Sequence, residues 1–98
     1  MIRAIIERHL KKGEDISQFL RQLRGAAIHE PGYVSGQTLV NTEDSSDIIV
    51  ISTWLSLEQW QSWAASEKRL NIYKQVRPLL TEEPKVRTYS VAATEGIA

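Results

Sequence analysis

The fold is decided by residues 53–80, TWLSLEQWQSWAASEKRLNIYKQVRPLL, which hold all three tryptophans of the chain. Ser56 followed by Gln59 predicts a capping box, in which each side chain satisfies a free backbone N–H group where a helix begins. Pro78 ends the helical run, because it has no N–H group and disfavours a helical residue before it. The stretch therefore reads as a helical segment whose indole rings belong either to the core or to the wall of a ligand pocket.

The rest of the chain supplies a further helix and four strands around this segment. Asp15 is the predicted N-cap of the earlier helix, which Pro31 and Gly32 close. The strands are predicted at residues 2–10, 33–41, 48–51 and 85–92. The order β-α-β-β-α-β indicates an α+β, ferredoxin-like fold, with two helices on one face of a four-stranded antiparallel sheet. The first and third strands are the most apolar, so we expect them in the middle of the sheet.

Two helices can cover only one face of such a sheet. The other face would still expose aliphatic side chains, particularly those of residues 48–51, which are apolar without alternation. A contiguous apolar patch of this kind usually marks a partner surface. A second copy that lays its own sheet against this face would cover both patches by two-fold symmetry, so we expect a homodimer.

Composition narrows the class of protein. The chain has 98 residues, which predicts one domain, residues 1–92, followed by a C-terminal tail, residues 93–98. Its 12 basic and 12 acidic residues give no net charge, whereas a nucleic-acid binder usually carries a basic excess. No apolar run is long enough to cross a bilayer, there is no signal-peptide pattern, and there is no cysteine. These features predict a soluble cytoplasmic protein that binds neither nucleic acid nor membrane.

No metal or phosphate site is predicted. His9 and His29 have no second ligand at a helical or hairpin spacing, so each is interpreted as a surface or strand-end histidine. The acidic turn around residues 43–47 lacks the spacing and the glycine of a calcium loop. Glycine-rich phosphate motifs, a nucleophile elbow and a dinucleotide fingerprint are also missing from the sequence.

The chain resembles the antibiotic biosynthesis monooxygenase (ABM) superfamily of dimeric α/β-barrel proteins over nearly its whole length. The resemblance rests on Pro31 and Gly32 before the second strand and on Trp54 at the end of the third strand. It also rests on the run of Ser56, Trp60 and Trp63 that follows. It implies a dimeric α/β barrel. It is less specific for chemistry, because the family includes quinone-forming monooxygenases, haem-degrading enzymes and members of unknown role.

Residues 63–77 resemble the haem-degrading branch in spacing. In that branch a tryptophan wedges against the haem, a histidine ten residues later ligates the iron, and an asparagine lies in the first strand. Trp63 matches the tryptophan, but Tyr73 stands in the histidine position and the first strand offers no asparagine. Residues ten apart do not share a face of an unbroken helix, so a common cavity requires a break. We predict that break near Ala65 and Ser66, with Ser66 as the new cap and a cavity between the helical stretch and the sheet.

The quinone-forming branch oxidises phenolic polycycles with O₂ and without metal or flavin, because the deprotonated substrate supplies the electrons. This resemblance leads us to predict a cofactor-independent monooxygenase that acts on a small aromatic or polycyclic phenol. The alternatives are a haem-binding or haem-degrading protein and a non-catalytic dimeric module that binds a small apolar ligand. The residues predicted as catalytic are Trp63, Tyr73 and Arg77, and those predicted for the substrate pocket are Trp60, Gln59 and His9.

The same residues also have structural interpretations. Trp60 falls on the apolar stripe with Leu57 and Ala64, which favours a core position over a pocket position. Trp63 lies at the edge of that stripe, so core and pocket stay equally open. Tyr73 is either a pocket residue or a half-buried ring with a solvated hydroxyl.

Overall fold

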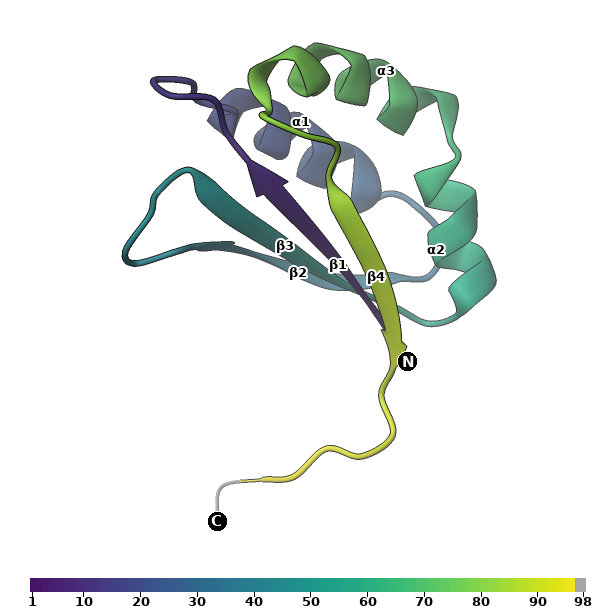
Figure 1. Ribbon diagram of the computed structural model, residues 1–98. Coiled ribbons are helices and arrows are strands. Elements are labelled where there is room, and N and C mark those ends of the chain that lie inside the picture. Colours follow the sequence, from purple (N-terminus) through teal and green to yellow (C-terminus); the bar gives the residue numbers. More distant parts are fainter. Residues whose placement is uncertain (97–98) are drawn as a thin grey trace.

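The structure, a computed structural model, describes residues 1–96 and has the predicted ferredoxin-like α+β fold (Figure 1). Three helices lie on one face of a four-stranded antiparallel sheet whose strand order is β2-β3-β1-β4. The elements are β1 Ile2–His9, α1 Ser17–Ala27, β2 Tyr33–Val40, β3 Asp47–Trp54, α2 Leu57–Ala64, α3 Glu67–Val76, the short 3₁₀ turn η1 Arg77–Leu79, and β4 Lys85–Ser90. The first and third strands are central, as their apolar sequences predict.

The predicted break in the second helical segment is confirmed. Helix α2 ends at Ala64, and α3 begins at Glu67 with Ser66 as its N-cap. The Ser66 hydroxyl oxygen accepts a hydrogen bond of 3.2 Å from the backbone N–H of Arg69. Because α3 starts with a new direction, it packs against α1, whereas α2 crosses the end of the sheet (Figure 1).

The predicted helix starts are partly confirmed. Ser56 is the N-cap of α2, and its oxygen accepts from the backbone N–H of Gln59 at 3.2 Å. The Gln59 side chain does not reach back to the cap backbone, because its Oε1 accepts from the Ser56 hydroxyl at 3.1 Å. Asp15 is not the N-cap of α1, since Ile16 holds that position. The Asp15 carboxylate instead accepts from the backbone N–H of Ser17 at 2.8 Å and so satisfies the first turn from one residue further out.

The core between helices and sheet divides into two clusters. The aliphatic cluster, which contains one phenylalanine, consists of Leu10, Ile16, Phe19, Leu20, Ile48, Ile72, Val76 and Leu80. The tryptophan cluster consists of Ala4, Ile6, Ala26, Ala27, Trp54, Trp60 and Trp63. The aliphatic cluster is built mainly from α1, α3 and the segments that flank them, and the tryptophan cluster joins α2 to the opposite end of the sheet.

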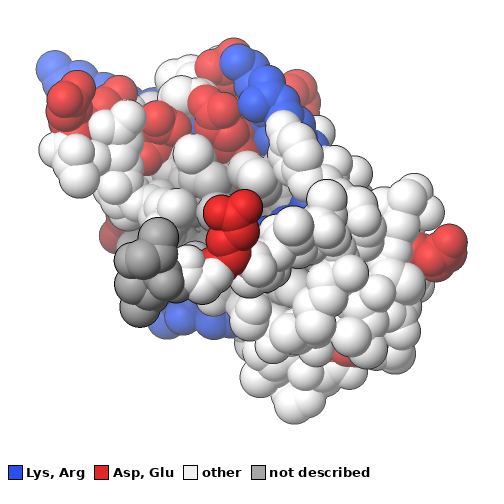
Figure 2. Space-filling view, turned by 90° about the horizontal axis from the view of Figure 1, so that it is seen from below, with Lys and Arg blue, Asp and Glu red and all other residues white. Residues whose placement is uncertain are grey.

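The face of the sheet away from the helices is open. Ile5, Ile49 and Ile51 lie half-buried on the two central strands. Leu39 and Tyr89, on the edge strands, are 45 % and 52 % exposed. Seen from below, much of the surface carries no charge (Figure 2). The sheet therefore presents an apolar surface that the helices do not cover.

The end of the chain runs on from β4. Residues 91–96 form neither helix nor strand, and residues 97 and 98 of the predicted tail lie outside the described residues. None of the helices in residues 1–96 is long and apolar enough to cross a membrane.

Candidate functional site

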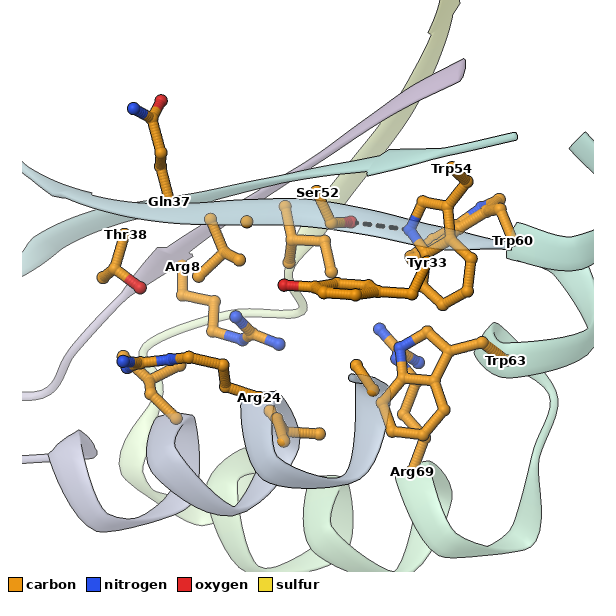
Figure 3. Close-up of a pocket in the computed structure, with 16 residues that line it drawn as sticks. Arg8, Arg24, Tyr33, Gln37, Thr38, Ser52, Trp54, Trp60, Trp63 and Arg69 are labelled. Carbon is orange, nitrogen blue, oxygen red and sulfur yellow. Dashed lines mark hydrogen bonds between the residues drawn. The ribbon is translucent and has the colours of Figure 1, made fainter. Parts of the chain in front are cut away.

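A cavity of about 290 Å³ lies between the inner face of the sheet and the helices (Figure 3). A cavity between the second helical segment and the sheet was predicted from the sequence and is confirmed. Its helical wall includes α1 as well as α2 and α3. The residues that line it are Ile6, Arg8, Leu20, Leu23, Arg24, Ala27, Tyr33, Gly36, Gln37, Thr38, Val50, Ser52, Trp54, Trp60, Trp63 and Arg69.

One end of the cavity is aromatic. Tyr33 meets Trp54 edge-to-face, with ring centroids 5.4 Å apart and planes at 80°. Trp54 meets Trp60 in a similar way, at 6.0 Å and 63°. The indole Nε1–H of Trp54 donates to the Ser52 hydroxyl at 3.0 Å, which satisfies a polar group that is otherwise buried. Trp63, from the last turn of α2, completes this wall (Figure 3).

Small residues on the sheet make room beside the rings. The strand register places Ala4, Ser52 and Gly36 in one row across the inner face, next to the row that contains Trp54 and Tyr33. At Gly36 an added Cβ atom would lie 2.7 Å from the Tyr33 hydroxyl, so the Tyr33 ring lies along the sheet over a position with no side chain. A hollow forms because side chains this small cannot reach the opposing helix.

Arg8 enters the cavity from the central strand β1. Its position alternates with Ala4 and Ile6 on the buried face, and it is only 3 % exposed. Burial, and then the neighbouring positive charge of Arg69, lower the pKa of the Arg8 guanidinium to about 10. Its Nε atom is buried without a hydrogen-bond partner, and no salt bridge within residues 1–96 involves this side chain. Arg8 is therefore a buried cation without a counter-charge.

Two further arginines reach the cavity from the helices. Arg69 places its guanidinium 5.7 Å from the ring centroid of Trp60 and donates from Nη1 to the carbonyl oxygen of Ala64 at 3.2 Å. Burial lowers the pKa of Arg69 as well. Arg24 is exposed on α1 and lies at the rim. The lining contains these three arginines and no aspartate or glutamate, so the cavity is cationic although the chain as a whole has no net charge.

The cavity brings together two of the six residues predicted as site residues. Trp60 and Trp63 line it, and both are also members of the tryptophan cluster. Gln59 does not line it, because its side chain bonds to Ser56 and lies over Gly32, where it occupies the space that a Cβ atom would need.

Tyr73 and Arg77 meet outside the cavity lining, at Glu83. The Tyr73 hydroxyl donates to the Glu83 carboxylate, and the Arg77 Nε–H donates to the same carboxylate at 2.7 Å. These two contacts lower the pKa of Glu83. Partial burial, and then the contact with Glu83, raise the pKa of the Tyr73 hydroxyl, which keeps it protonated and disfavours a tyrosinate ligand. The pair fastens α3 to the loop before β4.

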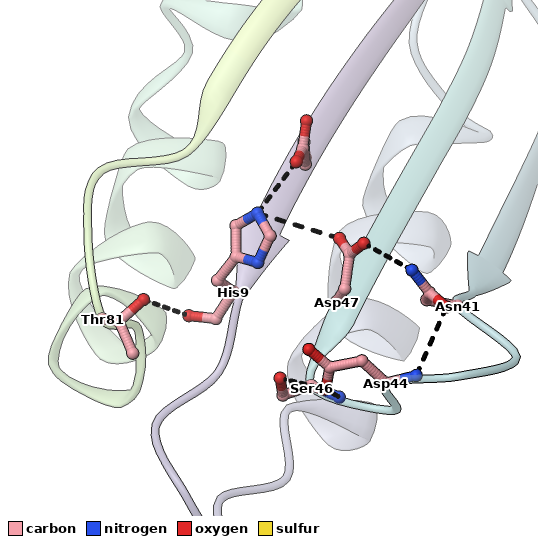
Figure 4. A network of polar contacts seen from close by, with 7 residues as sticks. His9, Asn41, Asp44, Ser46, Asp47 and Thr81 are labelled. Carbon is pink, nitrogen blue, oxygen red and sulfur yellow. Dashed lines mark hydrogen bonds and ion pairs between the residues drawn. The ribbon is translucent and has the colours of Figure 1, made fainter.

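His9 lies on the opposite face of the sheet from the cavity, at the end of β1 (Figure 4). Its Nε2 is 2.8 Å from Glu7 Oε2 and 3.8 Å from Asp47 Oδ1. The bond to Glu7 and the charge of Asp47 raise the pKa of His9. The three side chains could together approach a metal ion, so His9 is less isolated than the sequence indicated. The strand register explains this, since it pairs His9 with Asp47, which lies 38 positions later.

Sequence reasoning missed the three arginines and Tyr33 as cavity residues. A signal for Arg8 was present, because it stands between Ile6 and Leu10 on a face of β1 that otherwise carries apolar side chains. Arg69 and Arg24 carried no such signal, because arginine is common on the exposed face of any helix.

Comparison with known proteins agrees with this architecture. A sequence model of the antibiotic biosynthesis monooxygenase (ABM) family matches residues 1–75. The chain belongs to this family. The family resemblance predicted from the sequence is therefore confirmed, and the matched region contains five of the seven regular elements and both central strands.

Several solved structures share the fold at low sequence identity. A predicted antibiotic biosynthesis monooxygenase from Nitrosomonas europaea is 17 % identical, with a TM-score of 0.85, over 95 % of this chain and 100 % of that one. SnoaB, a cofactor-independent oxygenase from Streptomyces nogalater, is 15 % identical, with a TM-score of 0.81, over 95 % of both chains. No curated protein sequence matches the chain. At these identities the structural likeness establishes the fold.

Proposed function

We propose that this ABM protein is a cofactor-independent monooxygenase that oxidises a small aromatic phenol with O₂. The observation that carries the proposal is the cavity, which combines a wall of tryptophan and tyrosine rings with guanidinium groups. Family membership and the fold shared with the oxygenase SnoaB support it.

The proposed reaction needs no external reductant. A phenol with a hydrogen at the para position reacts with O₂ to give the para-quinone and water. One oxygen atom forms the new carbonyl group and the other leaves as water, while the ring gives up two hydrogens and supplies all four electrons. The protein must therefore bind the ring, exclude bulk water and favour the phenolate, which is the electron-rich form of the substrate.

The cavity can favour the phenolate by charge. The lining has no carboxylate or imidazole to act as an ordinary general base. Guanidinium groups in a site of low dielectric lower the pKa of a bound phenol instead, because they stabilise its anion. Arg69 is suited to this role, since stacking on Trp60 and the bond to Ala64 fix it beside the aromatic wall. The rate should rise with pH until the bound phenol is fully ionised.

The size of the cavity favours a small substrate. Pockets for drug-sized ligands usually measure about 300–1,000 Å³, and this one, at about 290 Å³, lies at the lower limit. A phenol of one or two rings suits this volume better than a larger polycycle.

A non-catalytic ligand-binding module is the second candidate, because the same lack of a general base would suit simple binding. The haem-binding alternative gains no support from the site. Tyr73, the only residue at the position of an iron ligand, bonds to Glu83 instead of lining the cavity.

Oxygen uptake by metal-free protein separates the two candidates. A panel of one-ring and two-ring phenols with a free para position should include a compound that consumes one O₂ for each quinone formed. Trp63→Leu should abolish this uptake, because the substrate ring would lose part of the aromatic wall against which it packs. The exposed neighbour on the same helix, Gln61→Ala, should leave it unchanged. Binding of such compounds without any oxygen uptake would favour the non-catalytic module.

We also propose that residues 1–92 form one domain and that two copies pair through the open face of the sheet. Ile5, Ile49 and Ile51 supply an apolar centre, with Leu39 and Tyr89 beside it. Light scattering should then report about twice the 11.1 kDa mass of one chain. A stable monomer at micromolar concentration would contradict the dimer.

A further inference from the structure

The cavity contains a cation that nothing in the described chain neutralises. Arg8 is only 3 % exposed, and its Nε atom has no hydrogen-bond partner. Removing a charge from water is costly unless a counter-charge and hydrogen bonds replace the lost hydration. No acidic residue lines the cavity, and an anionic ligand would supply the missing counter-charge.

The cavity also has two chemically different ends. On the inner face of the sheet, Arg8 pairs with Ile48, whereas Trp54 pairs with Ile2. The backbone positions of these two pairs are six residues apart, roughly 20 Å at 3.3 Å per residue, and the Arg8 side chain extends from its strand toward the rings (Figure 3). Figure 3 shows Arg8, Arg24 and Thr38 toward one end of the cavity and Trp54, Trp60 and Trp63 toward the other. A matching ligand has a flat ring at one end and an anion at the other.

A ligand that is already ionised at neutral pH neutralises Arg8 without having to lose a proton on binding. Arg8 stays cationic at neutral pH, because its lowered pKa of about 10 is still well above 7. An ordinary phenol, with a pKa near 10, is neutral in that range, whereas a carboxylic acid with a pKa near 4 is ionised. Carboxylate geometry also matches the fork of a guanidinium, which donates two parallel hydrogen bonds.

We propose that the natural ligand is a hydroxylated aromatic carboxylic acid, whose carboxylate binds the guanidinium of Arg8 while its ring packs among Tyr33, Trp60 and Trp63. This rests on the proposed function, whose substrate it narrows from a phenol to a phenolic acid. Arg24, exposed at the rim, attracts the anion toward the cavity. Arg69, fixed against Trp60, remains available for the phenolic oxygen.

The test compares two probes of nearly the same shape, the anion 6-hydroxy-2-naphthoate and its neutral amide, 6-hydroxy-2-naphthamide. Isothermal titration calorimetry at pH 7 should show that the wild-type protein binds the acid at least about tenfold more tightly than the amide. In Arg8→Met, which has a side chain of similar length without charge, the acid should lose this advantage while the amide binds as before. Arg8→Lys keeps the charge without the fork and should retain a smaller preference.

Exposed Arg21 on α1 provides the matched control, because Arg21→Met removes an equal charge away from the cavity. This variant should keep the full preference for the acid. Equal binding of acid and amide by the wild type, a preference that survives in Arg8→Met, or no binding of the acid at millimolar concentration would each overturn the inference.

Failure of this inference can be told apart from failure of the proposed function. Quinone formation and oxygen uptake with neutral phenols, together with equal binding of the two probes, would retain the monooxygenase and remove the carboxylate. A strong preference for the acid without oxygen uptake from any phenol would retain the Arg8 site and remove the enzyme.

Discussion

The two clusters of the core are built from different kinds of side chain. In the aliphatic cluster, side chains from helices α1 and α3, from strand β3 and from the flanking segments meet one another, and Ile16, Val76 and Leu80 are almost wholly buried. In the tryptophan cluster, large rings stand opposite alanines, and the cavity lies beside them. Both clusters cover the same face of the same sheet.

This difference teaches how one small domain can combine stability with a site. Interiors pack closely when neighbouring side chains match in volume, as they do in the aliphatic cluster. Next to the tryptophan rings, Ala4, Ala27 and Gly36 leave space that is not filled. The rigid rings cannot bend into it, and the side chains of these small residues are too short to reach it. Both clusters therefore stabilise the fold, and the tryptophan cluster also preserves a hollow.

The largest expected effect on stability is that of Trp60→Ala. Trp60 is 4 % exposed and contacts both Trp54 and Arg69. Its removal should lower the free energy of unfolding by roughly 3–5 kcal/mol, the usual cost of emptying a buried aromatic site. Denaturant unfolding measures this loss. An unchanged unfolding midpoint would show that Trp60 serves the cavity alone and not the core.

Leu80→Ala makes the corresponding change in the aliphatic cluster. Leu80 is fully buried at the end of η1, so the variant should lose about 3 kcal/mol of unfolding free energy. Its affinity for 6-hydroxy-2-naphthoate should stay within about twofold of the wild type, because Leu80 does not line the cavity. A loss of binding as large as that of a cavity variant would mean that the two clusters do not have separate roles.

Arg8→Met should change stability in the opposite direction. Without ligand, replacing the buried unpaired cation by an apolar side chain should raise the free energy of unfolding by roughly 2 kcal/mol. The folded protein holds the Arg8 proton less tightly than the unfolded chain, because burial lowers the pKa of the guanidinium from its ordinary value to about 10. Arg8 should therefore make wild-type stability rise with pH across that interval, and the variant should lack this contribution. A variant less stable than the wild type at pH 7 would indicate a hidden partner for Arg8.

Gly36→Ala should have the smallest effect on stability. Its new Cβ meets the Tyr33 hydroxyl, which is the tip of a side chain that can move, so the free energy of unfolding should change by less than about 1 kcal/mol. The displaced ring should nevertheless narrow the cavity and weaken binding of 6-hydroxy-2-naphthoate several-fold in calorimetry. Unaltered binding would show that Tyr33 is not part of the ligand wall.

Most of the fold could be predicted from the sequence, because the positions of the helices and strands are determined by short-range sequence patterns. Alternation in β1, the continuous apolar run of residues 48–51 and the caps at Ser56 and Ser66 each have a short-range physical cause. The order of the elements placed β1 and β3 in the middle of the sheet, and the polarity of the strands supported this placement. The same local reasoning placed the N-cap of α1 one residue early, where Asp15 is the stronger capping residue but Ile16 takes the position.

The site could be predicted only in part, because it depends on contacts between distant segments. Trp60 and Trp63 could be predicted from their residue type and their spacing along the helix. Tyr73 and Arg77 were grouped with them by the family resemblance and by the predicted break at Ser66. The break is present, but Glu83 from a later loop binds both side chains outside the cavity lining. The position of Arg69 also depends on this break, because the start of α3 decides the direction in which the Arg69 side chain points.

The most direct test of the account is a crystal structure of the protein with 6-hydroxy-2-naphthoate. We expect the naphthalene ring in the cavity of the tryptophan cluster, between Tyr33 and Trp63, and both carboxylate oxygens within about 3 Å of the Arg8 guanidinium. The aliphatic cluster should be unchanged. A ligand bound on the open face of the sheet, or seated in the cavity with its carboxylate turned away from Arg8, would contradict the claim that this half of the core is kept hollow to bind an aromatic acid.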